Sequence, residues 1–263
     1  MDPRYDAVVD ALRGCHGVAV GFSGGADSTL LLACARAAVG AEHVVALTAV
    51  TPYMVRQEIG DAVGLATELG IRHELVEMDM PAGVQDNPPD RCYRCKHRMY
   101  GLLSERARLL GVNKLLDASN LDDADCSRPA LHALHDLGIT TPFIEHGIDK
   151  EAVRAISQAL GLPTWHKPSN ACLLTRMPHN HPVSMRELQC VEEAERLLHD
   201  MGFESVRVRC HGHLARIEVA PAQRIRLMQQ ADEIAQALHA LGFRHVCADL
   251  FGYRHGSMSE PGI

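Results

Sequence analysis

Apolar positions along the first two thirds of the chain recur with the periods of helices and of short buried strands in turn. The pattern over Pro3–Leu12 predicts an amphipathic helix, and the apolar run His16–Phe22 predicts a strand after it. Further strands are predicted at Val44–Val50, Ile71–Met78 and Val112–Ala118, and further helices at Ser28–Ala38, Val55–Leu69 and Asp149–Leu160. Because strands that alternate with helices at this spacing form parallel sheets with right-handed crossovers, we expect an α/β domain.

The rhythm changes at the irregular, proline-containing segment Pro163–Pro182, which is long enough to indicate a functional loop. Beyond it the pattern predicts helices and strands in the order of a small α+β module. These are helix Ser184–Met201, strands Ser205–Cys210 and Leu214–Ala220, helix Gln223–Leu241 and strand His245–Leu250. We therefore expect two domains, residues 1–180 and residues 181–263.

Composition and charge narrow the class of protein. The 263 residues carry a formal net charge of −7, which argues against nucleic acid as the main partner, because phosphate backbones attract a basic surface. The apolar runs are too short to span a bilayer, and the first residues lack the apolar core of a signal peptide. We therefore expect a cytoplasmic protein, in which nine cysteines do not indicate a disulfide framework.

The sharpest local pattern is the hexapeptide Ser-Gly-Gly-Ala-Asp-Ser at residues 23–28, between a predicted strand and a predicted helix. Adjacent glycines let an anion approach the backbone, and the helix start supplies free N–H groups. A Walker A loop requires a lysine that is absent here, so the loop suits pyrophosphate better than γ-phosphoryl transfer. The expected nucleotide contacts are Ser23, Gly24, Gly25, Asp27 and Ser28. Asp27 can hold Mg²⁺ between phosphates or cap the helix, and the alternative for the whole loop is a simple tight turn.

A pair of cysteines, Cys92 and Cys95, lies three residues apart at the expected start of a helix that runs to about Leu110. Asp90 can cap this helix, and the helix start and neighbouring basic residues favour thiolates. Such a pair can bind a metal, form a redox disulfide or do neither.

Two thiols do not complete a metal site, and Cys172 in the proline-containing segment is the candidate third ligand. Three thiolates would hold a [4Fe–4S] cluster and leave one iron open for sulfide. Zinc is the competing metal, with His97 or His166 as a fourth ligand. Three unrelated cysteines are the remaining alternative.

Residues 23–28 resemble the PP-loop of the ATP pyrophosphatases, which cleave ATP between its α and β phosphates. Ala118–Asn120, after a later strand, is similar to a segment near the nucleotide in those enzymes. The resemblance implies a Rossmann-like domain with a parallel sheet over residues 1–180. It also places Asn120 near the nucleotide and Lys96 near the pyrophosphate.

Motifs in both predicted domains are similar to those of the LarE family of ATP-dependent sulfur transferases. They are Asn87–Lys96, Ala118–Asp123 with Arg128-Pro129, Lys167-Pro168 before Ala171–Leu173, Arg207–Arg209, Ala215–Glu218, Asp249–Arg254 and Gly256–Met258. The residues after the cysteine, Leu174–Arg176 and Met177–His179, depart from the family pattern. LarE enzymes make the pyridinium bis-thiocarboxylate mononucleotide of the nickel-pincer cofactor.

The resemblance implies a two-step reaction. ATP activates a carboxylate of pyridinium-3,5-biscarboxylic acid mononucleotide as an adenylate and releases pyrophosphate, and sulfur then displaces AMP. In one branch of the family a lone cysteine matching Cys172 gives up its own sulfur. In the other branch three cysteines hold a [4Fe–4S] cluster that carries sulfide, and Cys92, Cys95 and Cys172 favour this branch. The family also implies a homo-oligomer.

The predicted strand Ser205–Cys210 carries two basic side chains that face the same way, Arg207 and Arg209. They can clamp the phosphate or the second carboxylate of the substrate, or lie on a solvated strand face. Glu218, in the neighbouring strand, can pair with one of them, with substrate, or in a surface ion pair. We expect the second domain to bind substrate and to form the oligomer.

Two other functions remain open. A tRNA thiolase also joins a PP-loop to three cysteines, although the acidic total and the lack of a recognisable RNA-binding module count against it. A regulatory protein that binds a nucleotide without catalysis would convert no ATP to AMP, whatever acceptor is supplied.

Overall fold

A computed structural model describes residues 2–124, 129–168 and 170–254 of the chain. The motif residues Arg128, Gly256, Ser257 and Met258 lie outside the described residues. The chain forms two compact units, Met1–Pro81 with Asp90–Asn170, and Ala82–Pro89 with Ala171–Ile263. This division falls ten residues before the predicted domain boundary at 180/181, and it adds residues 82–89 to the second unit.

The first unit is built on a parallel sheet of four strands in the order β3-β2-β1-β4. The strands are β1 (Val18–Gly21), β2 (Val44–Val50), β3 (Arg72–Glu77) and β4 (Leu115–Leu116). The predicted α/β class is confirmed, and β2 has the predicted bounds, whereas β4 is much shorter than predicted. Because β1 has β2 on one side and β4 on the other, the ends of β1 and β4 form a switch point, where open α/β sheets bind ligands.

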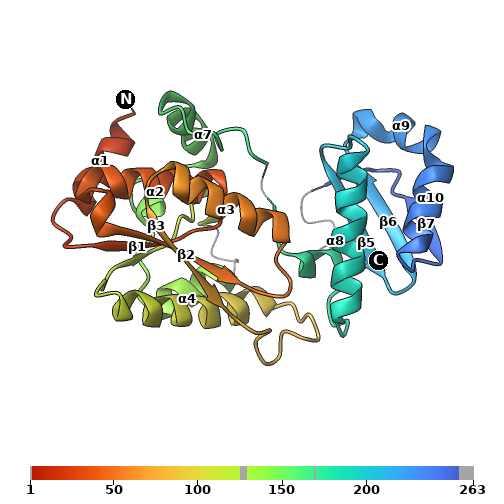
Figure 1. Ribbon diagram of the computed structural model, residues 1–263, viewed down its shortest axis with the longest axis horizontal. Helices are drawn as coiled ribbons and strands as arrows, with labels where there is room; N and C mark the ends of the chain where they lie inside the picture. The colour runs from red at the N-terminus through yellow and green to blue at the C-terminus, as the bar shows by residue number, and fades with distance from the viewer. Residues whose placement is uncertain (1, 125–128, 169, 255–263) are drawn as a thin grey trace. The chain divides into compact units, whose positions relative to one another are not determined.

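Helices cover both faces of this sheet (Figure 1). They are α1 (Pro3–Leu12), α2 (Ala26–Val39), α3 (Arg56–Glu68), α4 (Arg91–Leu109), α5 (Pro129–Asp136), α6 (Pro142–Glu145) and α7 (Lys150–Ala159), with 3-10 turns η1 (Ala41–His43) and η2 (Leu121–Asp123). Val18 and Val20 of β1 pack with α1, α2, α3 and α7, whereas Ala19 packs with α4 and α5 on the other face. The period-two alternation of β1 therefore separates two apolar cores. The short helices α5 and α6 were not predicted.

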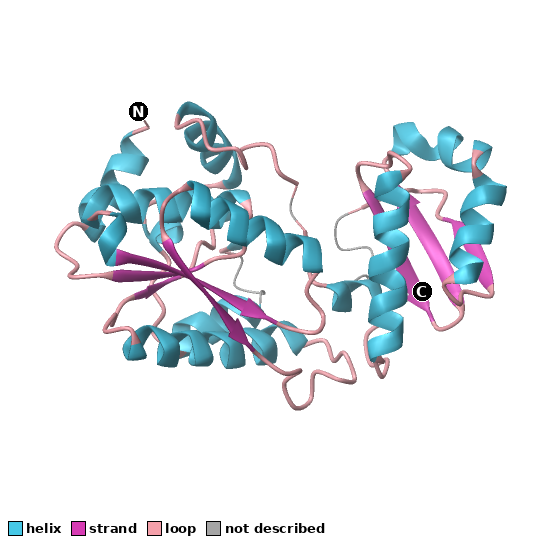
Figure 2. Cartoon of the chain, viewed as in Figure 1, coloured by secondary structure: helices cyan, strands magenta, loops and turns pink. Residues whose placement is uncertain are grey.

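The second unit places helices on a sheet of three strands in the order β5-β6-β7 (Figure 2). Its elements are η3 (Leu173–Arg176), α8 (Met185–Asp200), β5 (Val206–His211), β6 (Leu214–Val219), η4 (Pro221–Gln223), α9 (Arg224–Gln229), α10 (Ala231–Ala240) and β7 (His245–Ala248). The single predicted helix Gln223–Leu241 is wrong, because Gln230 leaves the helical conformation and separates α9 from α10. Within the described ranges, no helix is both long and apolar enough to cross a membrane.

A buried asparagine ties residues 82–89 to the rest of the second unit. Asn87 has a left-handed φ of 50° and no exposed surface. Its Nδ2 donates to the carbonyl oxygens of Leu174, Met177 and Pro178 at 3.2, 3.2 and 2.8 Å. The segment before α4 therefore supports the loop that contains η3.

Gly21, at the end of β1, leaves space that the Tyr100 side chain of α4 occupies, and a Cβ at residue 21 would overlap the Tyr100 hydroxyl. We expect Gly21→Ala to destabilise the protein by about 1–3 kcal/mol, the usual effect of overpacking a core. Gly101→Ala is the matched control. Gly101 follows Tyr100 in the middle of α4, and a Cβ there would meet open space. Chemical unfolding should show Gly101→Ala at least as stable as the parent, by up to about 1 kcal/mol. Equal stability of the two variants would contradict this packing argument.

Candidate functional site

The connection between β1 and α2 is a tight turn held by two serines. Ser23 Oγ lies 3.0 Å from Ser28 Oγ and accepts from the Gly25 amide at 3.3 Å, while Ser28 Oγ accepts from the Ser23 amide at 3.2 Å. Gly24 has φ +69°, and a Cβ there would lie 3.0 Å from the Ala62 Cα of α3. Only glycine fits both the conformation and the space at this position. The predicted strand–loop–helix setting of residues 23–28 is therefore present.

A cavity of about 280 Å³ opens beside this turn, at the ends of β1 and β4. Four predicted residues, Ser23, Asp27, Ser28 and Lys96, line it. Ser119 and Asp123 of the motif Ala118–Asp123 also line it, together with Tyr100 and Asp117, two polar residues that the sequence did not single out. The space beside the glycine turn is thus open, which a nucleotide site requires.

Lys96 of α4 is held at the cavity by a buried carboxylate. Its Nζ lies 2.9 Å from Asp117 Oδ2 and 3.5 Å from Ser119 Oγ, and the Tyr100 hydroxyl donates to Asp117 as well. Burial alone raises the pKa of Asp117, but the Lys96 ammonium and the hydrogen bonds outweigh it, so the net pKa is below its ordinary value. Burial and the same carboxylate raise the pKa of Tyr100, which stays a neutral donor.

Asp27 lies within the first turn of α2 and links three elements. Its Oδ1 accepts from Asn120 Nδ2 at 2.9 Å, and its Oδ2 forms an ion pair with Lys150 of α7. The N-cap of α2 is Gly25, so the alternative that Asp27 caps the helix is wrong. Asn120, predicted from its resemblance to a nucleotide-binding segment, is thus in contact with the turn through Asp27.

A second lysine, Lys167 of the proline-containing segment, contacts the turn. The sequence indicated no role for it beyond its place in a motif. Lys167 Nζ donates to the Gly24 carbonyl at 3.3 Å and lies 2.8 Å from Glu58 and 3.0 Å from Asp61, both in α3. Burial alone lowers the pKa of Lys167, but hydrogen bonds and charges of the two acids outweigh it and raise the net value. Asn170 also donates to Glu58, at 3.2 Å.

Cys92 and Cys95 lie in the first turn of α4, as predicted, in the first unit. Cys92 is exposed, and Cys95 is partly buried with its Sγ 3.0 Å from the Tyr53 hydroxyl. Asp90 stands at the N-cap, but its carboxylate pairs with Arg94 at 2.8 Å and makes no capping bond.

Cys172 stands at the N-cap of η3 in the second unit. Across residues 2–124, 129–168 and 170–254, no three His, Cys, Asp or Glu side chains are grouped so that they could hold a metal ion. The rings of the alternative zinc ligands, His97 and His166, pack against Tyr93 and Trp165. A ligand set of Cys92, Cys95 and Cys172 therefore stays a prediction.

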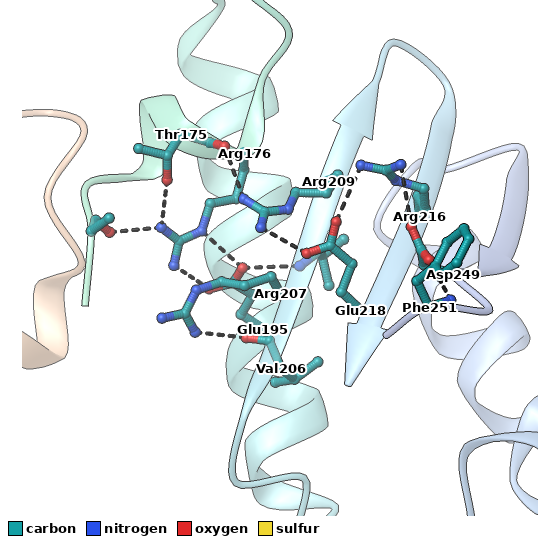
Figure 3. A network of polar contacts seen from close by, with 12 residues as sticks. Thr175, Arg176, Glu195, Val206, Arg207, Arg209, Arg216, Glu218, Asp249 and Phe251 are labelled. Carbon is teal, nitrogen blue, oxygen red and sulfur yellow. Dashed lines mark hydrogen bonds and ion pairs between the residues drawn. The ribbon is translucent and has the colours of Figure 1, made fainter. Parts of the chain in front are cut away.

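Two of the predicted substrate residues of the second unit, Arg209 and Glu218, belong to a network of ion pairs (Figure 3). Arg209 Nη2 lies 2.7 Å from Glu218, and Arg216 bridges Glu218 at 3.1 Å and Asp249 at 3.3 Å. Glu218 has no exposed surface and Arg209 is 5% exposed. Both alternatives from the sequence, a solvated strand face for Arg209 and a surface ion pair for Glu218, are therefore wrong.

Arg207 lies on the same strand as Arg209, and its guanidinium stands over the Tyr253 ring at 5.4 Å. Burial lowers the pKa of Arg207, and the neighbouring Arg176 and Arg209 guanidiniums act in the same direction. Figure 3 shows the Arg207 guanidinium beside the ion-paired side chains of Arg176 and Glu195. A guanidinium at this place can bind a phosphate or a carboxylate.

A parallel sheet with a glycine turn between β1 and α2, beside a cavity at the switch point, defines a Rossmann-like domain of the PP-loop class. Residues 6–99 match the NAD synthase family. An NH(3)-dependent NAD(+) synthetase of Hyperthermus butylicus is 42% identical over 69 residues, 25% of this chain and 24% of that protein.

Two relatives match nearly the whole chain. An uncharacterized protein of Synechocystis sp. is 39% identical over 92% of this chain and 91% of its own length. The pyridinium-3,5-bisthiocarboxylic acid mononucleotide synthase of Lactiplantibacillus plantarum is 34% identical over 96% of this chain and 92% of its own length. The chain belongs to the family of this synthase, the LarE family.

The buried Asp117 should make stability depend on acid pH. Because its folded pKa is lowered, its contribution is complete above the unfolded pKa of about 3.9 and is lost as pH falls through the folded value. We expect Asp117→Asn to destabilise the protein by about 3 kcal/mol at pH 7 and pH 5, and by less at pH 3, in urea unfolding. The exposed Asp10→Asn is the control. A loss for Asp117→Asn that is the same at all three pH values would contradict the assigned cause.

Proposed function

We propose that the chain is an ATP-dependent sulfurtransferase that thiolates a carboxylate of pyridinium-3,5-biscarboxylic acid mononucleotide, an intermediate of the nickel-pincer cofactor. The observation that carries the proposal is the open cavity beside the glycine turn, lined by Ser23, Ser28 and Lys96, in a chain of the LarE family. That the protein is cytoplasmic and a homo-oligomer stays a prediction.

In the first step a substrate carboxylate oxygen attacks the α-phosphorus of ATP, and pyrophosphate leaves. The amides of Gly24 and Gly25, the hydroxyls of Ser23 and Ser28, and Lys96 stabilise the charge that develops on pyrophosphate. Asp117, which also accepts from the Tyr100 hydroxyl, holds Lys96 toward the cavity. Asp27, with Asn120 beside it, would hold Mg²⁺ in exchange for its ion pair with Lys150, and the ion would neutralise phosphate charge.

In the second step a sulfur nucleophile attacks the acyl carbon and AMP leaves with the former carboxylate oxygen. Arg207 supplies a desolvated positive charge for the substrate phosphate or second carboxylate. Arg209, paired with Glu218, helps to form the strand face on which that anion would bind.

The cysteines fit a [4Fe–4S] cluster in their donor chemistry. Cys92 and Cys95 share one face of the first turn of α4, next to basic residues, and Cys172 is the third thiol. When bound, the cluster would supply sulfide at its open iron. The Tyr53 hydroxyl, 3.0 Å from Cys95 Sγ, supports the orientation of one ligand.

Cys172→Ala tests the sulfur step. We expect the variant to release pyrophosphate from ATP in the presence of substrate at the parental rate but to form no thiocarboxylate, because activation does not use the thiol. Pyrophosphate release and product mass are measured in the same reaction. Cys247→Ser, an exposed cysteine on β7, is the matched control and should retain both steps. Thiolated product from Cys172→Ala would refute the assignment.

Anaerobic purification tests the sulfur source. We expect iron and acid-labile sulfide in the ratio of a [4Fe–4S] cluster, with a brown visible spectrum that Cys92→Ser and Cys95→Ser each abolish and Cys247→Ser retains. A colourless protein in which Cys172 loses one sulfur per turnover would instead establish the sacrificial branch. Bound zinc would also contradict the cluster.

A further inference from the structure

Arg176, the last residue of η3, is a charged side chain with no exposed surface. Its Nη1 donates to the carbonyl oxygen of Ala171 at 2.7 Å and to that of Cys172 at 3.1 Å. The guanidinium therefore contacts the peptide groups before and after the Cys172 Cα. A buried cation is thus directed at the backbone of the residue that is proposed to handle the sulfur.

The Cys172 carbonyl receives further hydrogen bonds from the same turn. The amide and the hydroxyl of Thr175 donate to it at 3.0 and 2.9 Å. Arg176 Nη1 also donates to the Thr175 hydroxyl at 2.9 Å, and Arg209 Nη1 donates to the Thr175 carbonyl at 3.0 Å. The backbone at Cys172 is thus held by hydrogen bonds from Arg176 and Thr175, and Thr175 is itself held by Arg176 and Arg209.

The other edge of the guanidinium is anchored to the body of the unit (Figure 3). Arg176 Nε and Nη2 donate to the two carboxylate oxygens of Glu195 in α8, at 3.0 and 2.9 Å. Glu195 Oε1 also accepts from the Val208 amide of β5 at 2.9 Å. A helix and a strand are therefore connected to the Cys172 backbone through one planar group.

A buried ion pair contributes little net stability compared with apolar packing of the same volume. The role of the Arg176–Glu195 pair is therefore argued from its geometry. Lysine cannot replace this arrangement, because an ammonium cannot bind Glu195 in bidentate fashion and reach two carbonyls at the same time. The arrangement therefore requires an arginine whose guanidinium Nη1 is fixed toward the carbonyl groups of residues 171 and 172.

We propose that Arg176 is a positioning residue for sulfur transfer, which holds the backbone of Cys172 on α8 and β5 so that its thiol is presented in one orientation. The proposal rests on the proposed function only in that Cys172 handles the sulfur. Arg176 acts through Cys172 and needs no contact with ATP or substrate. Its loss should therefore uncouple thiolation from adenylate formation.

The experiment measures thiocarboxylate formed per pyrophosphate released in Arg176→Lys and Glu195→Gln. Both variants should keep the parental KM for ATP and the parental rate of pyrophosphate release in the presence of substrate. The coupling ratio should fall by about 10–100-fold, the scale expected when a reacting group is misplaced by about 1 Å. Hydrogen–deuterium exchange supplies a readout without turnover, in which the amides of residues 173–177 should exchange faster in both variants.

Leu198→Ala is the matched control, because Leu198 is a fully buried residue of the same helix α8 whose side chain has no hydrogen-bonding group. It should lower the unfolding temperature as much as Arg176→Lys, yet keep the coupling ratio and the slow exchange of residues 173–177. An equal loss of coupling in Leu198→Ala, or an unchanged ratio in both Arg176→Lys and Glu195→Gln, would overturn the proposal. If Arg176→Lys does not fold, Glu195→Gln alone decides the outcome.

The result separates this proposal from the proposed function. Product formed by Cys172→Ala would refute the role of the thiol itself, whatever the Arg176 variants do. Loss of product in Cys172→Ala together with full coupling in the Arg176 and Glu195 variants would refute only the positioning role.

Discussion

Two glycines, Gly21 at the end of β1 and Gly24 in the turn after it, constrain the first unit more than any single contact. Gly21 leaves the volume that Tyr100 fills, and Tyr100 in turn donates to Asp117, which holds Lys96. Gly24 lets the turn pass within contact distance of Ala62 in α3. The placement of polar groups around the cavity therefore follows from close approach of backbone to neighbouring elements, and not from the serine hydroxyls alone.

The regular elements of the chain were predictable where apolar positions formed a bounded run or a long amphipathic face. Strand β2 and helix α1 have the predicted bounds. The failures occurred where local pattern carries little information. Helix α6 has four residues, too few for a helical period, and α9 and α10 are separated by a single residue whose conformation the surrounding pattern does not specify.

The candidate site was predictable where its residues are contiguous in the chain, and less so where partners are distant. The turn at residues 23–28 is one motif, whereas Lys150 pairs with Asp27 across 123 positions and Lys167 with Asp61 across 106. In the second unit the strand periodicity correctly placed Arg207 and Arg209 on one face. In the strand register Arg207 stands opposite Glu218, yet the ion pair joins Glu218 to Arg209, a diagonal choice that depends on the surrounding network.

The chain passes between its two units at 81/82, 89/90 and 170/171, and the short excursion between β3 and α4 brings Asn87 to the loop after Cys172. A fragment that starts at residue 171 would lack this amide and expose three carbonyl groups that it satisfies. The second unit is therefore not a portable module. Recombination or fusion at 170/171 alone would separate the loop after Cys172 from the Asn87 side chain that supports it.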